Sequence, residues 1–243
     1  MTQLPKFEMQ TIGFIRSCFK EKFGIPRQSG LATEAVATIE ICPPYNREEA
    51  FRGLEDVSHL WISFVFHESI NDHWKPMVRP PRLGGNKRLG VFATRSPNRP
   101  NPIGLSVVRL ESVSAQNGLV CLEIRGGDFL DGTPVLDIKP YVAYADSIAD
   151  ALSGLAPRPP ENKLRVLFSV NAEEQLSQRE DSAGLDLRLL VEQLLQTDPR
   201  PAYKAGSEED RLFGMRLMDF DLKWRVVGEE VVVESLEKTR AQL

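Results

Sequence analysis

Short runs of β-branched and aromatic residues, separated by Gly, Pro and Asn, recur along the first 145 residues of the chain. Runs of this length and composition are typical of β-strands. Because turn residues rather than long helical stretches separate them, the pattern favours a barrel or a sandwich over alternating strands and helices. The predicted strands cover residues 8–16, 35–41, 57–67, 90–95, 105–113, 119–125 and 134–139, and one helix is predicted over residues 46–54, capped by Asn46.

The pattern changes after residue 145. Residues 146–163 combine small residues with prolines and lack strand or helix periodicity, which indicates a linker. Beyond it we predict a strand over residues 164–170, a helix capped at Asn171 with Glu174 three residues on, and strands over 212–220, 222–227 and 230–236. A second predicted helix has an apolar face formed by Leu187, Leu190, Val191, Leu194 and Leu195.

These patterns together predict a mainly β chain. We expect an antiparallel β-barrel domain over residues 1–145, a linker over residues 146–163 and a small α+β domain over residues 164–243. The glycine pairs at 84–85 and 126–127 lack the spacing of a dinucleotide fingerprint, and no phosphate-binding loop motif occurs. The barrel is therefore expected to be unrelated to the Rossmann fold.

Charge is distributed unevenly along the chain. The formal net charge is −4, yet residues 75–110 carry eight basic and no acidic side chains, so the remainder sums to about −12. A local basic surface in an acidic chain suits a small nucleic-acid footprint, because domains that grip a long duplex are usually basic overall. A solvated surface balanced by distant acids is the alternative. The basic residues are Lys75, Arg79, Arg82, Lys87, Arg88, Arg95, Arg99 and Arg109.

The spacing of cysteines, histidines and apolar residues argues against a disulfide-linked, metal-binding, secreted or membrane-spanning protein. The three cysteines are far apart and contain no C-x-x-C pair, so we expect reduced thiols, and the three histidines form no recognisable ligand set, so we expect no metal. The N-terminal residues lack an apolar signal segment, and the densest apolar run, residues 60–66, is too short to span a bilayer. We expect a cytoplasmic protein without a membrane segment.

Several unusual strings remain once these patterns are accounted for. Pro26-Arg27-Gln28 and Phe66-His67-Glu68 place polar groups beside rigid turns, and R-S-P-N-R-P-N-P-I-G spans residues 95–104. D-G-T-P-V-L-D-I-K-P-Y spans residues 131–141, and D-P-R-P-A-Y spans residues 198–203. Over almost its whole length the chain resembles the TsaA-like family, whose longer bacterial members are the TrmO methyltransferases acting on tRNA.

The resemblance implies a single-barrel methyltransferase that uses S-adenosylmethionine and works as a homodimer with the cofactor near the subunit interface. The implied reaction transfers a methyl group to N6 of threonylcarbamoyladenosine, next to the anticodon of tRNA-Thr. An anticodon loop suits a small basic footprint, since sequence-specific RNA readers favour unstacked single-stranded bases. Two other functions stay open: a non-catalytic RNA-binding or regulatory module with a small-molecule pocket, and a methyltransferase acting on another substrate.

The resemblance also implies the cofactor-binding residues. Arg27 and Arg95 have the guanidinium geometry to pair with the methionine carboxylate, and Asp131 can accept from ribose hydroxyls or the ammonium group. Surface ion pairing of the arginines and a turn role for Asp131 are the alternatives. Relatives often carry glutamine where this chain has Glu68. The implied cofactor-binding set is Pro26, Arg27, Gln28, His67, Glu68, Arg95, Leu105, Leu130, Asp131, Gly132 and Thr133.

Methyl transfer from a sulfonium is governed by alignment of the reacting atoms. The N6 nitrogen of a threonylcarbamoyl adduct is urea-like, so removing its proton should assist the attack. We predict that Asp137, Lys139 and Tyr141 serve this step, with Asp137 and Lys139 on one face of a strand; an ion pair that braces the barrel is the alternative. The predicted tRNA-binding residues are Arg99, Asp198, Arg200 and Tyr203.

Overall fold

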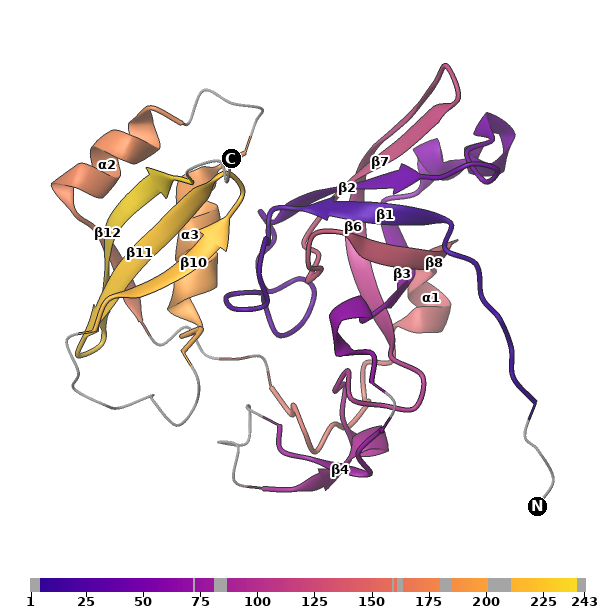
Figure 1. Ribbon diagram of the computed structural model, residues 1–243, viewed down its shortest axis with the longest axis horizontal. Helices are drawn as coiled ribbons and strands as arrows, with labels where there is room; N and C mark the ends of the chain where they lie inside the picture. The colour runs from indigo at the N-terminus through magenta and orange to yellow at the C-terminus, as the bar shows by residue number, and fades with distance from the viewer. Residues whose placement is uncertain are drawn as a thin grey trace.

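Six antiparallel strands close into a barrel in the order β1-β2-β7-β6-β3-β8. The computed structural model describes residues 5–71, 73–80, 87–158, 160, 164–179, 185–200 and 211–239. The barrel, which lies on the right of Figure 1, confirms the prediction of a mainly β fold. Its strands are β1 (Gly13–Ser17), β2 (Val36–Ile41), β3 (His59–Val65), β6 (Ile103–Gln116), β7 (Leu119–Arg125) and β8 (Thr133–Pro140).

Strand alternation fills the interior of the barrel. Ile15 pairs with Ile39, which in turn pairs with Leu122, and all three side chains are fully buried. Since successive residues of a strand point to opposite faces, the intervening residues lie on the outside. At one end the ring of Phe64 packs edge-to-face against Phe66 and Phe129, with both pairs of centroids 5.0 Å apart. These rings form the apolar floor on which the candidate site is built.

Two local predictions for the barrel domain are wrong. Residues 90–95 do not form a strand: β5 (Leu89–Gly90) pairs only with β4 (Met77–Val78) and is followed by the 3-10 helix η5 (Val91–Ala93). Residues 46–54 do not form one helix, because Gly53 adopts a φ of +94° between the 3-10 helices η1 (Glu48–Phe51) and η2 (Leu54–Asp56). The Asn46 side chain bonds to the carbonyl of Gly118 instead of capping a helix.

The predicted strand edges also shift. The strand predicted over residues 57–67 is β3 and ends at Val65, because the chain turns there into the 3-10 helix η3 (His67–Ser69). The strand predicted over residues 105–113 is longer and forms all of β6. After β8 a short helix, α1 (Ala143–Asp146), leads out of the barrel.

The second part of the chain is a four-stranded sheet in the order β10-β11-β12-β9 with two helices. Its elements are β9 (Arg165–Phe168), α2 (Val170–Ser177), α3 (Leu187–Gln196), β10 (Phe213–Leu217), β11 (Phe220–Val227) and β12 (Glu230–Lys238). The cap of α2 is Ser169, whose side chain accepts from the Ala172 N–H, so the capping prediction at Asn171 is wrong. The turn between β10 and β11 falls inside the strand predicted over residues 212–220.

Residues 18–35 link the two parts of the chain. Cys18, Phe19, Ala32 and Ala35 belong to the same buried cluster as α3 and the sheet that contains Trp224. The Met218 N–H donates to the carbonyl of Cys18 at 2.7 Å, so backbone pairing crosses between the parts. The segment 18–35, drawn in indigo between the two bodies in Figure 1, is therefore anchored by the second part as well as by the barrel.

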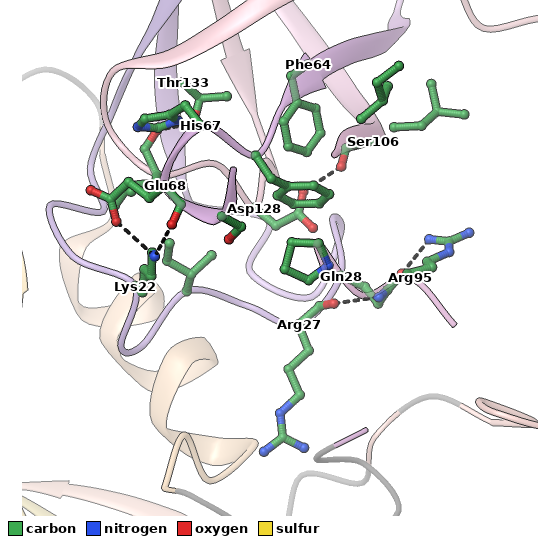
Figure 2. Close-up of a pocket in the computed structure, with 18 of the residues that line it drawn as sticks. Lys22, Arg27, Gln28, Phe64, His67, Glu68, Arg95, Ser106, Asp128 and Thr133 are labelled. Carbon is green, nitrogen blue, oxygen red and sulfur yellow. Dashed lines mark hydrogen bonds and ion pairs between the residues drawn. The ribbon is translucent and has the colours of Figure 1, made fainter. Parts of the chain in front are cut away.

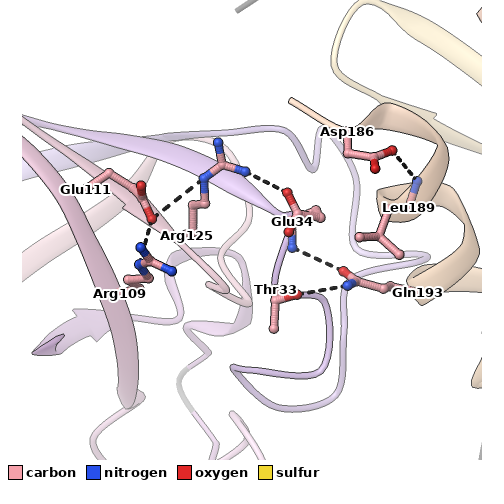
Figure 3. Close-up of polar contacts among 8 residues, drawn as sticks. All are labelled: Thr33, Glu34, Arg109, Glu111, Arg125, Asp186, Leu189 and Gln193. Carbon is pink, nitrogen blue, oxygen red and sulfur yellow. Dashed lines mark hydrogen bonds and ion pairs between the residues drawn. The ribbon is translucent and has the colours of Figure 1, made fainter. Parts of the chain in front are cut away.

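Two further contacts show how closely this segment packs. A Cβ at Gly24, whose φ is +88°, would lie 2.2 Å from the sulfur of Met215 on β10. The side-chain amide of Gln193 on α3 accepts from the Glu34 N–H and donates to the Thr33 hydroxyl, at 3.1 and 2.8 Å (Figure 3). The segment 18–35 therefore packs directly against β10 and α3 of the second part of the chain.

The remaining predictions concern reduced cysteines and the lack of a membrane-spanning segment. All three cysteines are free, and burial raises the pKa of the Cys18 thiol to about 12, so Cys18 is a packed, protonated thiol. Within the residues that the structure describes, no helix has the length and apolar character needed to cross a membrane.

Candidate functional site

A cavity of about 560 Å³ opens at the side of the barrel, beside the ends of β3 and β6. This volume lies in the range typical of small-molecule sites. The segment 18–35, the turn after β3, the proline-rich loop before β6 and the turn before β8 all contribute to its wall. Nine of the residues implied by the family resemblance line it: Pro26, Arg27, Gln28, His67, Glu68, Arg95, Leu105, Leu130 and Thr133.

The apolar part of the wall is aromatic. Phe64 and Phe66 line the cavity, and Phe64 is held in place by Phe129 on its other side. Phe64 is only 3% exposed, so its position is set by the barrel core. Rings fixed in this way provide a flat apolar surface of the kind that planar heterocycles bind.

Gly104 allows the Phe64 ring to sit where it does. A Cβ at Gly104 would lie 2.1 Å from Cζ of Phe64, so Gly104→Ala must displace the ring into the cavity or out of the core. We expect Gly104→Ala to destabilise the fold by about 1–3 kcal/mol, the usual cost of overpacking, and to weaken cofactor binding. Urea unfolding and calorimetric titration with S-adenosylhomocysteine would measure both effects.

The Gly104→Ala prediction has a matched control at Gly214. This glycine also lies in a strand, but a Cβ there would be no closer than 3.6 Å to any neighbour. Gly214→Ala should therefore leave cofactor affinity unchanged. Equal affinities for the Gly104→Ala variant and the unaltered chain would show that the ring does not shape the site.

Charged groups of both signs line the cavity (Figure 2). The Arg95 guanidinium donates to the side-chain oxygen of Gln28, which ties the proline-rich loop to the Pro26-Arg27-Gln28 turn. On the other side Lys22 pairs with the Glu68 carboxylate at 3.2 Å and donates to the Glu68 carbonyl at 2.9 Å. The segment 18–35 thus contacts two other walls of the cavity through its side chains.

Asp128 is a site residue that the sequence analysis missed. Its carboxylate accepts from the Ser106 hydroxyl at 2.6 Å, and both residues line the cavity. Burial raises the pKa of the Asp128 carboxyl, and the hydrogen bond from Ser106 and the charge of Arg95 only partly oppose that shift. The available signal was an acid that directly follows Gly126-Gly127 and lies three residues before Asp131, where the recognised motif begins.

Asp131 and Gly132 do not line the cavity. Asp131 accepts from the Ser17 N–H at 2.8 Å and pairs with Lys20 at 3.0 Å, so its carboxylate ties the end of β1 to the turn before β8. Gly132 adopts a φ of +78°, which glycine tolerates best, and donates its N–H to the carbonyl of Ile15. In this structure both residues shape the turn that presents Leu130 and Thr133.

The predicted catalytic residues Asp137, Lys139 and Tyr141 lie outside the cavity. Asp137 and Lys139 pair with each other on β8. Lys139 is opposite Trp61 in the β3–β8 register, and the Tyr141 ring lies 5.9 Å from the Trp61 ring. Because Trp61 lines the cavity, Lys139 and Tyr141 border it beside Trp61, and Asp137 is linked to this border through Lys139.

The described residues among those predicted to bind tRNA lie in two places. Arg99 lines the cavity. Arg200 is only 7% exposed and donates two hydrogen bonds to the Asp198 carboxylate, at 2.7 and 2.8 Å, so the two side chains bind each other. Tyr203 lies outside the residues that the structure describes, as does Arg82 of the basic segment.

Comparison with known proteins identifies the family. A model described as the tRNA-methyltransferase O N-terminal domain matches residues 14–147, and the TrmO C-terminal domain matches residues 161–239. The tRNA (adenine(37)-N6)-methyltransferase of Escherichia coli K12 is 46% identical over 234 residues, covering 96% of this chain and 99% of that protein. The RcsF protein of Pseudomonas aeruginosa, whose name refers to S-adenosylmethionine-dependent methyl transfer, is 52% identical over 221 residues, covering 91% and 93%.

The solved structures agree with the family models. A crystal structure of TrmO from Pseudomonas aeruginosa superposes with a TM-score of 0.80 at 42% identity and covers 96% of this chain and 99% of that chain. The closed barrel with its charged, aromatic-walled cavity defines a methyltransferase of the β-barrel class. The chain belongs to the tRNA-methyltransferase O family, as its sequence motifs predicted.

Proposed function

We propose that the chain transfers a methyl group from S-adenosylmethionine to N6 of adenine 37 in tRNA, with threonylcarbamoyladenosine in tRNA-Thr as the substrate. One observation carries the proposal: the cavity collects an aromatic wall, three arginines and two carboxylates at one side of the barrel. The names of the relatives support methylation of adenine 37, and the basic segment supports an RNA substrate.

The cavity residues fit this cofactor chemically. Phe64 and Phe66 offer apolar rings to the adenine, and Arg95 offers a guanidinium to the methionine carboxylate. Asp128 and Glu68 offer carboxylates to the cationic end of the molecule, which carries an ammonium and a sulfonium. We propose that Asp131 and Gly132 support this site by forming the turn beneath it.

S-adenosylmethionine supplies an electrophilic methyl group when it is bound. The chain orients the acceptor nitrogen and excludes water, because alignment governs such displacements. We propose that Asp137 accepts the N6 proton, with Lys139 and Tyr141 orienting it from the border of the cavity. We propose that Arg99, Asp198, Arg200 and Tyr203 contribute to tRNA binding.

We further propose that the chain is a cytoplasmic homodimer. Several apolar side chains are exposed on the face of the barrel near Trp61, among them Ile103, Leu105 and Tyr144. Exposed apolar side chains on one face of a protein often mark an interface with another protein. A partner subunit packed on this face would lie beside the cavity and beside Asp137 and Lys139.

The proposal is tested with two preparations of tRNA-Thr, one carrying the threonylcarbamoyl group and one lacking it. Each is incubated with the protein and with S-adenosylmethionine labelled in its methyl group. We expect label only in the modified tRNA, and mapping should place it on adenine 37. Cofactor and tRNA binding without transfer would contradict the proposal and favour a regulatory module, whereas transfer to the unmodified tRNA would indicate another substrate.

A further inference from the structure

A second cavity, of about 840 Å³, adjoins the first. Arg27, Gln28, Arg95 and Pro97 line both cavities, so the two cavities lie side by side at these residues. The remaining wall of the second cavity comes from the β4–β5 region, the proline-rich loop and residues Leu155 and Ala156. Of the predicted tRNA-binding residues that the structure describes, Arg99, Asp198 and Arg200, none lies in that wall.

The second cavity is strongly basic. Five of its lining residues are cationic, namely Arg27, Lys75, Arg79, Arg88 and Arg95, and none of the described lining residues is acidic. Over the described part of the chain, no ion pair involves Lys75, Arg79 or Arg88, although the whole chain carries 34 acids against 30 basic residues. Concave surfaces lined by charge of one sign focus the field and attract the opposite charge.

A short β-hairpin brings three of these cations to the wall of the second cavity. Met77 pairs with Gly90 and Val78 with Leu89, so Arg79 and Arg88 lie at one end of this hairpin and Lys75 at the other, and the three form the cationic rim of the cavity. The Val91 N–H donates to the carbonyl of Pro76 at 2.9 Å and closes the base of this small hairpin. Lys75, Arg79 and Arg88 are all exposed, which leaves their charges accessible to a ligand.

Two exposed aromatic rings belong to the same small unit. Trp74 is 46% exposed and Phe92 is 72% exposed, and their ring centroids lie 6.0 Å apart. Trp74 directly precedes Lys75, and Phe92 lies in η5 directly after β5. Exposed rings beside a groove of cations form the usual platform for single-stranded nucleic acid, because bases stack on the rings while the backbone follows the cations.

We infer that the second cavity, with Trp74 and Phe92 at its side, binds the single-stranded loop of the RNA substrate through its phosphates and an unstacked neighbouring base. The inference rests on the proposed function, because the shared wall at Arg27 and Arg95 places this loop next to the cofactor. A charged cavity filled by the cofactor alone is the competing outcome, and it predicts a different response to substitution.

Charge removal at the rim tests the inference. The variant combines Lys75→Ala, Arg79→Ala and Arg88→Ala, and binding of a fluorescent anticodon stem–loop RNA is measured by anisotropy over a range of salt concentrations. The affinity falls as salt rises, and the loss of three phosphate contacts should make this dependence shallower by about 2 units of slope in log affinity against log salt. This change corresponds to roughly a hundredfold weaker binding at about 0.1 M salt. Affinity for S-adenosylhomocysteine should not change.

A matched variant controls for net charge. Lys6→Ala, Arg52→Ala and Lys238→Ala remove three exposed positive charges away from both cavities, so RNA affinity and its salt slope should stay close to those of the unaltered chain. Trp74→Ala with Phe92→Ala should weaken RNA binding while leaving the salt slope unchanged, since stacking releases no counterions. This pattern separates the roles of the rings and the cations.

Three results would overturn the inference. The first is an unchanged salt slope in the rim variant of a protein that binds and methylates tRNA; this leaves the proposed function intact. The second is an equal loss of S-adenosylhomocysteine affinity, which would assign the cavity to the cofactor. The third is an equal slope change in the charge control, which would indicate a non-local field. Failure of the unaltered chain to methylate any tRNA would instead contradict the proposed function.

Discussion

Asp128→Asn is expected to yield a chain that is more stable at neutral pH yet binds S-adenosylmethionine about tenfold or more weakly. The stability gain follows from the raised pKa of the Asp128 carboxyl, which burial causes. A carboxyl with a raised native pKa destabilises the fold as pH rises from its unfolded pKa through its native pKa, because the native state binds the proton more tightly. Asparagine does not titrate, so the variant should not lose this stability as pH rises.

The loss of affinity follows from the negative charge that the Asp128→Asn variant lacks. Hydrogen bonds and contacts to charged groups contribute about 1.5–3 kcal/mol, and a factor of ten corresponds to about 1.4 kcal/mol. S-adenosylhomocysteine lacks the sulfonium charge, so its affinity should fall less than that of S-adenosylmethionine. The ratio of the two affinities is therefore the measurement that isolates the role of Asp128.

The experiment combines titration calorimetry with urea unfolding at about pH 4 and about pH 7.5. The stability difference between the variant and the unaltered chain should widen toward the higher pH. Asp56→Asn, which alters an exposed carboxylate far from the cavity, serves as the control. If the two ligands lose affinity equally, Asp128 does not recognise the sulfonium and acts only by shaping the wall.

Trp224→Ala should have the largest effect on stability, although the residue lies in the second part of the chain. Trp224 is fully buried, and its ring stacks on Phe23 and Phe213 with centroids 5.9 and 6.0 Å apart. Truncating such a side chain costs about 3–5 kcal/mol. Because Phe23 precedes Pro26-Arg27-Gln28 by three residues, we also expect a loss of cofactor affinity.

The Trp224→Phe variant tests how much of this stability comes from an aromatic ring at this position. Within the described residues the indole N–H of Trp224 is buried and has no hydrogen-bond partner, so phenylalanine removes an unsatisfied donor and keeps an aromatic ring. It should cost far less than alanine in urea unfolding and should retain cofactor binding. Cofactor affinity that is preserved in a folded Trp224→Ala protein would show that the barrel alone holds the segment 18–35.

The barrel was predictable because its strands alternate regularly. Residues such as Ile39 and Leu122 face inward at every second position, and this periodicity is visible without any long-range information. Residues 90–95 have the composition of a strand, but the barrel offers them no neighbour, and the Thr94 hydroxyl closes a turn onto the Val91 carbonyl instead. Strand composition alone does not specify a partner.

Residues of the candidate site could be predicted from sequence only where they lie within a recognised family motif. Arg95, His67 and Thr133 were named through the family strings, and the cavity brings them together. Asp128 has no such string, and its importance depends on a contact with Ser106, 22 residues away in sequence. Likewise the sequence offers Arg200 as a cation available to RNA, whereas the fold buries it against Asp198.

The shared cluster of residues 18–35 and the second sheet also sets an order of events during synthesis. The carbonyl of Cys18 accepts a hydrogen bond from the Met218 N–H, and β9 pairs in parallel with β12, which is synthesised much later. Contacts between residues so far apart in sequence form late, after the cost of closing long loops is met. On the ribosome, the segment that carries Arg27 meets its partners on α3 and β10 only after those elements have been synthesised, so we expect a barrel released before then to bind S-adenosylmethionine weakly.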